Sequence, residues 1–370
     1  MYRIKKIKKD KKTILVLDNS TSYYIKYCLP KNTSYEEISV RNNFNIIITF
    51  NFFFHFLINF IRTKKIILSS ILAVCKIKKT KVIISFTDNT PLIGKIHSYR
   101  KDINCISIQN GMRSSKDFHG WKSIEYFPKL YGFGEFELDL LKKLNKNYNS
   151  YKAVGSLKYG IFKTFHNNIQ EPIIKENISY ISTWKDQNWF NQAKGYSNLS
   201  QVLDACKKLN FNFKIVLRYT EGSKLNHKEK QFYNSIIDSS SDLFTNNIHD
   251  LGSYKFCEKS NIIVTFASTL GYELYGYGKK VIFLGLLDTF TSETNNIFSE
   301  SFEKLPEFIK VNSSELSKLN EKITYLDNLS ESEYLDLTKV SRKYYMHYQE
   351  KKAHEIVKSD IAKFLDIHYN

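Results

Sequence analysis

The sequence predicts an α/β protein with two parallel β-sheets, and two observations support this prediction. First, short runs of β-branched and aromatic residues recur along the chain, each followed by a polar or glycine-bearing turn, with helical segments between them. This alternation is typical of parallel sheets whose strands are buried on both faces. Second, the pattern stops at a polar connector, roughly residues 163–177, and then starts again. We therefore divide the 370 residues into two domains, residues 1–165 and 166–370.

Each domain contains several predicted strands. Those of the first domain are residues 13–17, 81–86, 103–108, 129–133 and 152–154, and those of the second are residues 178–181, 213–217, 262–266 and 281–284. Predicted helices are residues 135–144, 199–209, 228–238 and 270–276, and a charged helical region extends from about 313 to 364. Two Rossmann-like domains of this kind would face each other across a cleft, a GT-B-like arrangement with C-terminal helices.

The segment Asn261–Gly285 carries the clearest site signal. It reads as a buried strand, a hydroxyl-rich turn, a short helix and a second buried strand. Parallel sheets bind ligands at the carboxyl ends of their strands, so Ser268 and Thr269 would lie there beside helix N–H groups that suit a phosphate. Glu273 follows one helical turn after Thr269 and could accept hydrogen bonds from ribose or sugar hydroxyls. The alternative is that Ser268 only caps the helix.

Polar side chains also follow other predicted strands, and the predicted cleft would bring them together. The first domain contributes Asp88, Asn89, Gln109, Asn110 and Arg113, and the second contributes Ser182, Thr183 and Arg218. Asp88 is the carboxylate best placed to deprotonate an acceptor hydroxyl, and the alternative is a turn residue that caps the next helix. Arg218 could hold a phosphate with two hydrogen bonds, and the alternative is a surface or ion-paired arginine.

Charge and cysteine content narrow the function classes. The formal net charge is +18, so we expect an anionic partner such as nucleic acid, an anionic membrane surface or a phosphorylated substrate. The five cysteines are widely spread and form no C-x-x-C pair, which argues against a disulfide framework and fits a reducing cytoplasm. Neither paired metal ligands nor a G-x-G-x-x-G loop occurs, so we predict no metal and no bound cofactor.

The most apolar segment is Phe44–Ile61. Its polar members Asn51, His55 and Asn59 recur every four residues, so they would line one face of a helix. Two interpretations follow. The preferred one is a helix packed in the core of the domain. The other is a helix that lies in a membrane interface, with the basic residues that follow it on anionic lipid.

Five motifs in a fixed order resemble those of bacterial surface-carbohydrate biosynthesis proteins. They are ISIQNGMRS at 106–114, YGFGEFELDLL at 131–141, VGSLK at 154–158, YISTW at 180–184 and VTFASTLGYELYGYGKKVIF at 264–283. These proteins are GT-B-like transferases similar to capsule Kdo and sialic-acid transferases and to teichoic-acid glycerophosphotransferases. The chain departs from such relatives at Arg218-Tyr219, where they often carry a His-Pro pair.

The resemblance implies a cytoplasmic, metal-independent glycosyltransferase, peripheral on the inner face of the membrane. Its co-substrate would be a nucleotide sugar, and its acceptor a glycan or lipid-linked glycan of a surface polysaccharide. Residues 1–165 would then form the acceptor-side domain and residues 166–370 the nucleotide-sugar-binding domain, with Ser268, Thr269 and Glu273 at the donor. Two alternatives remain, a sugar-nucleotide epimerase of the same fold and a non-enzymatic basic binding protein. Nucleic acid is not the expected partner, because the lysines are dispersed and no recognition motif occurs.

Overall fold

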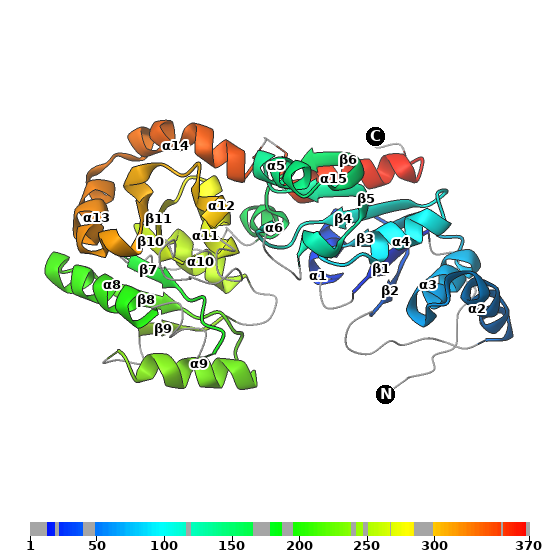
Figure 1. Cartoon of the computed structure of the whole chain (residues 1–370), viewed down its shortest axis with the longest axis horizontal. Helices are drawn as coiled ribbons and strands as arrows, with labels where there is room; N and C mark the ends of the chain where they lie inside the picture. Colours follow the sequence, from blue (N-terminus) through cyan, green and yellow to red (C-terminus); the bar gives the residue numbers. More distant parts are fainter. Residues whose placement is uncertain are drawn as a thin grey trace. The chain divides into compact units, whose positions relative to one another are not determined.

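Two compact units, each built on one parallel sheet, make up the protein, which was analysed as a computed structural model (Figure 1). Unit 1 comprises Met1–Phe133, Glu137–Leu157 and Gln349–Asn370, and unit 2 comprises Gly134–Phe136 and Lys158–Tyr348. The structure describes residues 13–18, 22–39, 49–115, 120–165, 178–186, 195–237, 242–246, 251–266, 268–284, 299–348 and 351–367. The predicted connector 163–177 lies mostly outside these ranges. The α/β fold class with two parallel sheets is confirmed.

The sheet of unit 1 has six described strands in the order β2-β1-β3-β4-β5-β6, and all neighbours are parallel. The strands are β1 (Ile14–Leu17), β2 (Tyr35–Ile38), β3 (Val82–Ser85), β4 (Asn104–Ile108), β5 (Tyr126–Gly132) and β6 (Asn147–Ala153). The chain adds β2 on one side of β1 and then crosses to add β3 on the other side. The topological switch point, where such sheets bind ligands, is therefore between β1 and β3.

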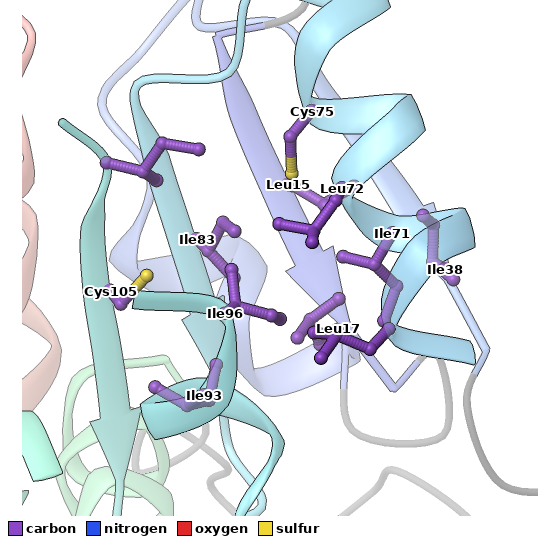
Figure 2. Close-up of a cluster of buried hydrophobic side chains, with 12 residues drawn as sticks. Leu15, Leu17, Ile38, Ile71, Leu72, Cys75, Ile83, Ile93, Ile96 and Cys105 are labelled. Carbon is purple, nitrogen blue, oxygen red and sulfur yellow. The ribbon is translucent and has the colours of Figure 1, made fainter. Parts of the chain in front are cut away.

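Helices surround this sheet in unit 1, and those that touch it do so through an apolar core. They are α1 (Ser22–Ile25), α2 (Phe50–Thr63), α3 (Ile66–Ile77), α4 (Leu92–Tyr99), most of α5 (Glu135–Lys143) and α15 (Ala353–Phe364). Helix α3 directs Leu68, Ile71, Leu72 and Cys75 at the sheet, the spacing of one helical face. Figure 2 shows Ile71, Leu72 and Cys75 of α3 gathered with residues of β1, β3 and α4 in a single cluster. The cluster fixes α3 directly on the sheet.

The sheet of unit 2 also has six described strands, in the order β12-β11-β10-β7-β8-β9, and all are parallel. The strands are β7 (Ile178–Ile181), β8 (Phe213–Val216), β9 (Leu243–Phe244), β10 (Ile262–Thr265), β11 (Lys280–Leu284) and β12 (Lys310–Val311). The described helices include α6 (Leu157–Phe165), α8 (Gly195–Leu209), α9 (Lys224–Asn234), α10 (Gly252–Glu258), α11 (Thr269–Gly276), α12 (Ser299–Phe302), α13 (Leu319–Asn328) and α14 (Glu331–Tyr345). Here the switch point lies between β7 and β10.

The last helix, α15, belongs to unit 1, although the sequence analysis assigned everything after residue 165 to the second domain. Asp360 of α15 accepts hydrogen bonds from the Tyr131 hydroxyl at 2.7 Å and from Nζ of Lys152 at 3.1 Å. The ammonium of Lys129 lies 4.6 Å from the centre of the Phe364 ring. These contacts hold α15 against β5 and β6, far from it in the sequence.

Helix α2 corrects the preferred interpretation of segment 44–61, of which residues 44–48 lie outside the described ranges. The helix packs on α3 rather than in the core, and much of its apolar surface is exposed. Of the predicted polar stripe, Asn51 is exposed, and the Nδ2 of Asn59 donates to the carbonyl of His55 at 2.8 Å. The interpretation as a core-packed helix was wrong. Among the described residues, no helix has both the length and the apolar character to cross a membrane.

Candidate functional site

The carboxyl edge of the second sheet gathers three of the predicted strand ends. Strand β7 pairs with β10 and with β8, and Ile181 lies opposite both Thr265 and Val216. Because the three strands end in register, the turns that follow them start side by side. These turns carry the predicted residues Thr183, Arg218, Ser268 and Thr269, which we call the β7–β10 edge. It lies at the switch point of its sheet.

Ser268 begins helix α11 with extended backbone, but its side chain accepts no capping hydrogen bond from the first turn. Its own N–H donates to Oγ1 of Thr265 at 3.3 Å. The alternative that the Ser268 hydroxyl only caps the helix therefore finds no support. A helix N-terminus carries partial positive charge, so this hydroxyl and the first turn together suit an anion.

Gly271 allows α11 to approach the sheet. A Cβ atom at this position would meet Cγ2 of Thr265 at 2.5 Å, which is too close for a side chain. Thr265 is the last residue of β10 and is completely buried. The contact therefore determines how close the N-terminus of α11 comes to the carboxyl end of β10.

Arg218 contributes positive charge to the β7–β10 edge. Its side chain is exposed, and Nη1 lies 3.5 Å from the carbonyl oxygen of Thr183 on the neighbouring turn. The guanidinium also lies 5.5 Å from the centre of the Tyr219 ring. An exposed guanidinium at the carboxyl edge of a sheet is a suitable partner for a phosphate, because its planar donors match phosphate oxygens.

Ser182 is buried behind this edge. This corrects the prediction that Ser182 contacts the nucleotide-sugar donor. It is 3% exposed, and its hydroxyl donates to the Glu229 carboxylate while it accepts from Tyr233 at 2.9 Å and from the Trp184 N–H at 3.2 Å. A hydroxyl has one proton and two lone pairs, so these three bonds use its full capacity. Ser182 therefore ties β7 to α9.

Glu229 is a residue that the sequence analysis missed. Its carboxylate accepts from the backbone N–H groups of Arg218 and Tyr219, both at 3.0 Å, as well as from Ser182. Burial raises the pKa of Glu229 above its ordinary value, and the three donors oppose that shift. Glu229 therefore holds the turn that presents Arg218. A lone glutamate inside a predicted amphipathic helix gave no signal of this role.

Glu273 is also enclosed, contrary to its prediction as an acceptor for ribose or sugar hydroxyls. It is 3% exposed, and Oε2 accepts a hydrogen bond from the Tyr254 hydroxyl at 2.6 Å. Tyr254 lies on α10 and Glu273 on α11, so the bond joins two helices of unit 2. We assign Glu273 a structural role.

In unit 1, Asp88 lies at the centre of a buried polar cluster. Its carboxylate accepts from Nε of Arg113 at 2.8 Å, from Nη2 of the same guanidinium, from the backbone N–H of Asn110 at 3.2 Å and from the Trp121 indole at 2.8 Å. The Asp88 side chain is 0% exposed and that of Arg113 is 10% exposed. We name Asp88, Asn110, Arg113 and Trp121 the Asp88 cluster.

The Asp88 cluster changes the interpretation of Asp88 as a general base. Four donors already occupy the carboxylate, and a proton taken from a substrate would displace one of them. Asn110 completes the cluster, because its Oδ1 accepts from Arg113 at 2.7 Å and its Nδ2 donates to the Phe86 carbonyl at 2.8 Å. Asp88 thus positions the turns after β3 and β4. The sequence placed three of these residues at strand ends but missed Trp121, which follows no predicted strand.

Gln109 and Asn89 lie beside the Asp88 cluster. Gln109 is buried, and its amide nitrogen donates to Glu137 and to the Gly111 carbonyl, both at 2.9 Å, while its oxygen accepts from the Phe133 N–H at 2.9 Å. Gln109 thus fastens the end of β4 to the end of β5 and is not open to a ligand. Asn89 is half-buried in the turn after β3.

The switch point of unit 1 holds two further residues that the sequence analysis did not select. Oγ1 of Thr87 donates to Oδ2 of Asp18 at 3.2 Å, and both residues are 1% exposed. Asp18 follows β1 with a φ of 72°, a conformation that few residues other than glycine adopt. An aspartate directly after a buried strand is the signal that would have identified it.

No group of three or more His, Cys, Asp or Glu side chains that could hold a metal occurs in the described part of the chain. All five cysteines are buried and free. Burial raises the pKa of each cysteine thiol above its ordinary value.

Comparison with protein families identifies the chain. Residues 106–358 match a family described as "putative O-antigen biosynthesis protein". The chain belongs to this family. The match covers the β7–β10 edge and three members of the Asp88 cluster, Asn110, Arg113 and Trp121, but begins after Asp88 itself. It confirms the resemblance to surface-carbohydrate biosynthesis proteins. A search of the curated proteins found no match.

Solved structures share the fold of this O-antigen family member. The chain is similar to MnaA of S. aureus in its co-structure with UDP, with a TM-score of 0.57 and 13% identity over 96% of this chain and 97% of that one. It is similar to the wall teichoic acid polymerase TagF, with a TM-score of 0.56 and 12% identity over 97% and 90%. A UDP-GlcNAc 2-epimerase of Methanocaldococcus jannaschii, in complex with UDP-GlcNAc and UDP, gives a TM-score of 0.56 and 12% identity over 95% and 99%. These similarities establish the GT-B-like fold.

Proposed function

We propose that this O-antigen family member is a glycosyltransferase that moves a sugar from a nucleotide donor to a surface-polysaccharide acceptor, without a metal. The observation that carries the proposal is the β7–β10 edge. Ser268 and Thr269 begin helix α11 there at the switch point, and an exposed arginine, Arg218, follows β8 on the other side of β7. Donor phosphates fit this arrangement because the helix N–H groups, the hydroxyls and the guanidinium can all donate hydrogen bonds to phosphate oxygens.

The same groups give the proposal its chemistry. When the bond between the sugar and the nucleotide breaks, negative charge develops on the phosphate that leaves. The Arg218 guanidinium and the N-terminus of α11 would stabilise that charge, and fixed donors of this kind commonly supply a large share of a rate enhancement. Thr183, Ser268 and Thr269 would orient the phosphate oxygens.

The acceptor would bind at the carboxyl edge of the first sheet. Asn89 is half-buried there and is the candidate contact, whereas Asp88, Gln109, Asn110 and Arg113 fix the turns around it. In this proposal Asp88 is a positioning residue. Its replacement would change acceptor KM more than donor affinity, because it acts on unit 1 alone.

A sugar-nucleotide epimerase is the second candidate. It is supported by the similarity to the UDP-GlcNAc 2-epimerase and to MnaA bound to UDP. Both candidates need a nucleotide sugar, and they differ in the need for an acceptor. Incubation of the protein with a nucleotide sugar alone, followed by product analysis, separates them, because only the epimerase converts its substrate without an acceptor. Retention of activity in a chelator tests metal independence.

Nucleotide binding is the first experiment. A ligand that binds only the folded protein raises its melting temperature, so UDP, CDP, GDP, ADP and CMP should be compared at fixed salt. We expect one of them to stabilise the wild type. Ser268→Ala and Arg218→Ala should each reduce the affinity for that nucleotide by about tenfold or more, since hydrogen bonds to charged groups are strong.

Two matched controls accompany these variants. Ser330→Ala removes a helix-capping serine that accepts from the Glu333 N–H in α14, and Lys207→Ala removes an exposed charge at the end of α8. Both lie away from the carboxyl edge of the sheet and should leave nucleotide affinity unchanged. Absence of a response to every nucleotide, or equal losses in control and test variants, would overturn the proposed donor site.

A further inference from the structure

Helix α2 carries an apolar stripe that faces solvent. The six members of the stripe are exposed by 41–90% and are Phe50, Phe53, Phe54, Leu57, Ile58 and Ile61. Their positions repeat at three and four residues, the spacing of one helical face. Ile66 and Ile67 continue the exposed apolar surface at the start of α3, at 63% and 44%. Side chains in this spacing are normally buried, so the stripe requires a partner.

A different face of α2 holds it to the protein. Phe52, Phe56 and Phe60 form a stacked row with ring centres 6.1 and 5.7 Å apart, and Phe52 is 4% exposed. Helix α2 packs on α3 and α3 packs on the sheet, so α2 forms an outer layer, as the two neighbouring blue helices show (Figure 1). The solvent-facing stripe is therefore not needed to pack α2 onto unit 1.

The charge around the stripe is entirely positive in sequence. Residues 38–87 contain eight Lys or Arg and no Asp or Glu. Arg62, Lys64 and Lys65 directly follow the stripe, and all three are exposed. Lys78 is excluded from this surface, because it is 6% exposed and pairs with Glu36 at 3.4 Å. An apolar stripe that adjoins exposed basic residues fits an anionic, apolar partner.

We propose that the α2–α3 hairpin, residues 50–77, binds the surface of an anionic lipid bilayer. The phenylalanine and isoleucine side chains of the stripe enter the boundary between headgroups and acyl chains, and Arg62, Lys64 and Lys65 contact the anionic headgroups. A bilayer accounts for both the apolar stripe and the basic residues beside it. The six side chains of the stripe can form no hydrogen bond with a partner, and residues 38–87 contain no acidic residue to pair with the basic ones. Unit 1 is then the part of the protein that touches the membrane.

Co-sedimentation with vesicles tests the proposal. We expect the full chain to bind phosphatidylcholine vesicles that contain phosphatidylglycerol, to bind pure phosphatidylcholine weakly, and to lose binding as salt rises. The double variant Phe50→Ser/Ile61→Ser should weaken binding by about tenfold or more, because it removes two exposed apolar anchors. Both side chains are largely exposed, so the fold should not depend on them. The matched control is Leu337→Ser/Val340→Ser, which replaces two exposed apolar residues of unit 2.

A second pair of variants tests the charge. Lys64→Gln/Lys65→Gln should reduce binding to anionic vesicles and flatten its salt dependence, whereas Lys207→Gln/Lys208→Gln, two exposed lysines of α8, should not. Equal binding to neutral and anionic vesicles, or none to either, would overturn the proposal. So would a dimer in light scattering without lipid that Phe50→Ser/Ile61→Ser converts to monomer, since the stripe would then join two copies. Nucleotide-dependent melting should be unchanged in all four variants, so this test is independent of the proposed function.

Discussion

The indole nitrogen of Trp121 donates a hydrogen bond of 2.8 Å to Oδ2 of Asp88, which lies 33 residues earlier in the chain. The same oxygen accepts from Nε of Arg113, so a neutral donor and a charged donor share it. This arrangement makes Asp88 a fixed acceptor in the core of unit 1. The contribution of this arrangement to stability can be measured by replacing one of the residues that bond to Asp88.

Arg113→Met should destabilise the protein by about 3–5 kcal/mol, because it leaves the Asp88 carboxylate buried without its countercharge. Equilibrium unfolding in urea measures the change. Arg100→Met is the matched control, since Arg100 makes a similar bidentate pair with Asp102 at the surface, where the side chains are 24% and 64% exposed. Its cost should stay below about 1 kcal/mol. Equal costs would show that the burial of the Asp88 pair is not what makes it important.

Ser182→Ala and Thr183→Ala should have opposite effects although the residues are adjacent. Loss of the Ser182 hydroxyl leaves Glu229 and Tyr233 short of a partner in the core, which should cost about 1–3 kcal/mol of stability. Nucleotide affinity, measured by calorimetry on folded protein, should change little. Thr183→Ala should leave the stability of the protein unchanged and reduce its affinity for the nucleotide. The reverse result would return Ser182 to the ligand site.

Gly271→Ala should push α11 away from β10, because the new methyl group would overlap Cγ2 of Thr265. We expect a loss of about 1–3 kcal/mol, the usual cost of overpacking, and weaker nucleotide binding. The double variant Thr265→Ser/Gly271→Ala removes the methyl group that is in the way and should recover much of both losses. Failure of this rescue would mean that Gly271 acts through something other than its contact with Thr265.

His354 should make the protein less stable in acid. Burial on α15 lowers the pKa of His354 to about 4 from an ordinary 6.5. Between these values the unfolded chain binds a proton that the folded protein does not, so stability falls as pH drops from 6.5 toward 4, by up to about 3 kcal/mol. In His354→Gln the midpoint of urea unfolding should vary less with pH over this range. His227→Gln, at an exposed site on α9, is the control and should follow the wild type.

Buried strands were predictable because their signal is local. Predicted strands 178–181 and 262–266 agree with β7 and β10 to within one residue, since each is a short uncharged run dominated by β-branched and aromatic residues. Strand β2, with the sequence YEEI, was missed because its glutamates are only partly buried at the sheet edge. Helix α9 starts earlier than predicted, at a Ser223 cap whose hydroxyl accepts from the Asn226 N–H.

The site was less predictable, because strand ends indicate where polar residues lie but not which of them pair. Asp88 and Arg113 are 25 residues apart, and their ion pair depends on how the turns after β3 and β4 approach each other. Periodicity likewise indicated an apolar face on α2, but not that this face is exposed. What covers a helix is a property of its neighbours, and one sequence contains no local signal for it.

The return of α15 to unit 1 also bears on synthesis. Asp360 and Phe364 contact β5 and β6, so the first sheet lacks part of its covering until the last helix has left the ribosome. Unit 2, which needs no residue after Tyr348, can complete its fold earlier. Translation proceeds from the N-terminus, yet the N-terminal unit is the last to be finished. A stop codon before Ala353 would therefore destabilise unit 1, which contains the first residues of the chain, more than unit 2.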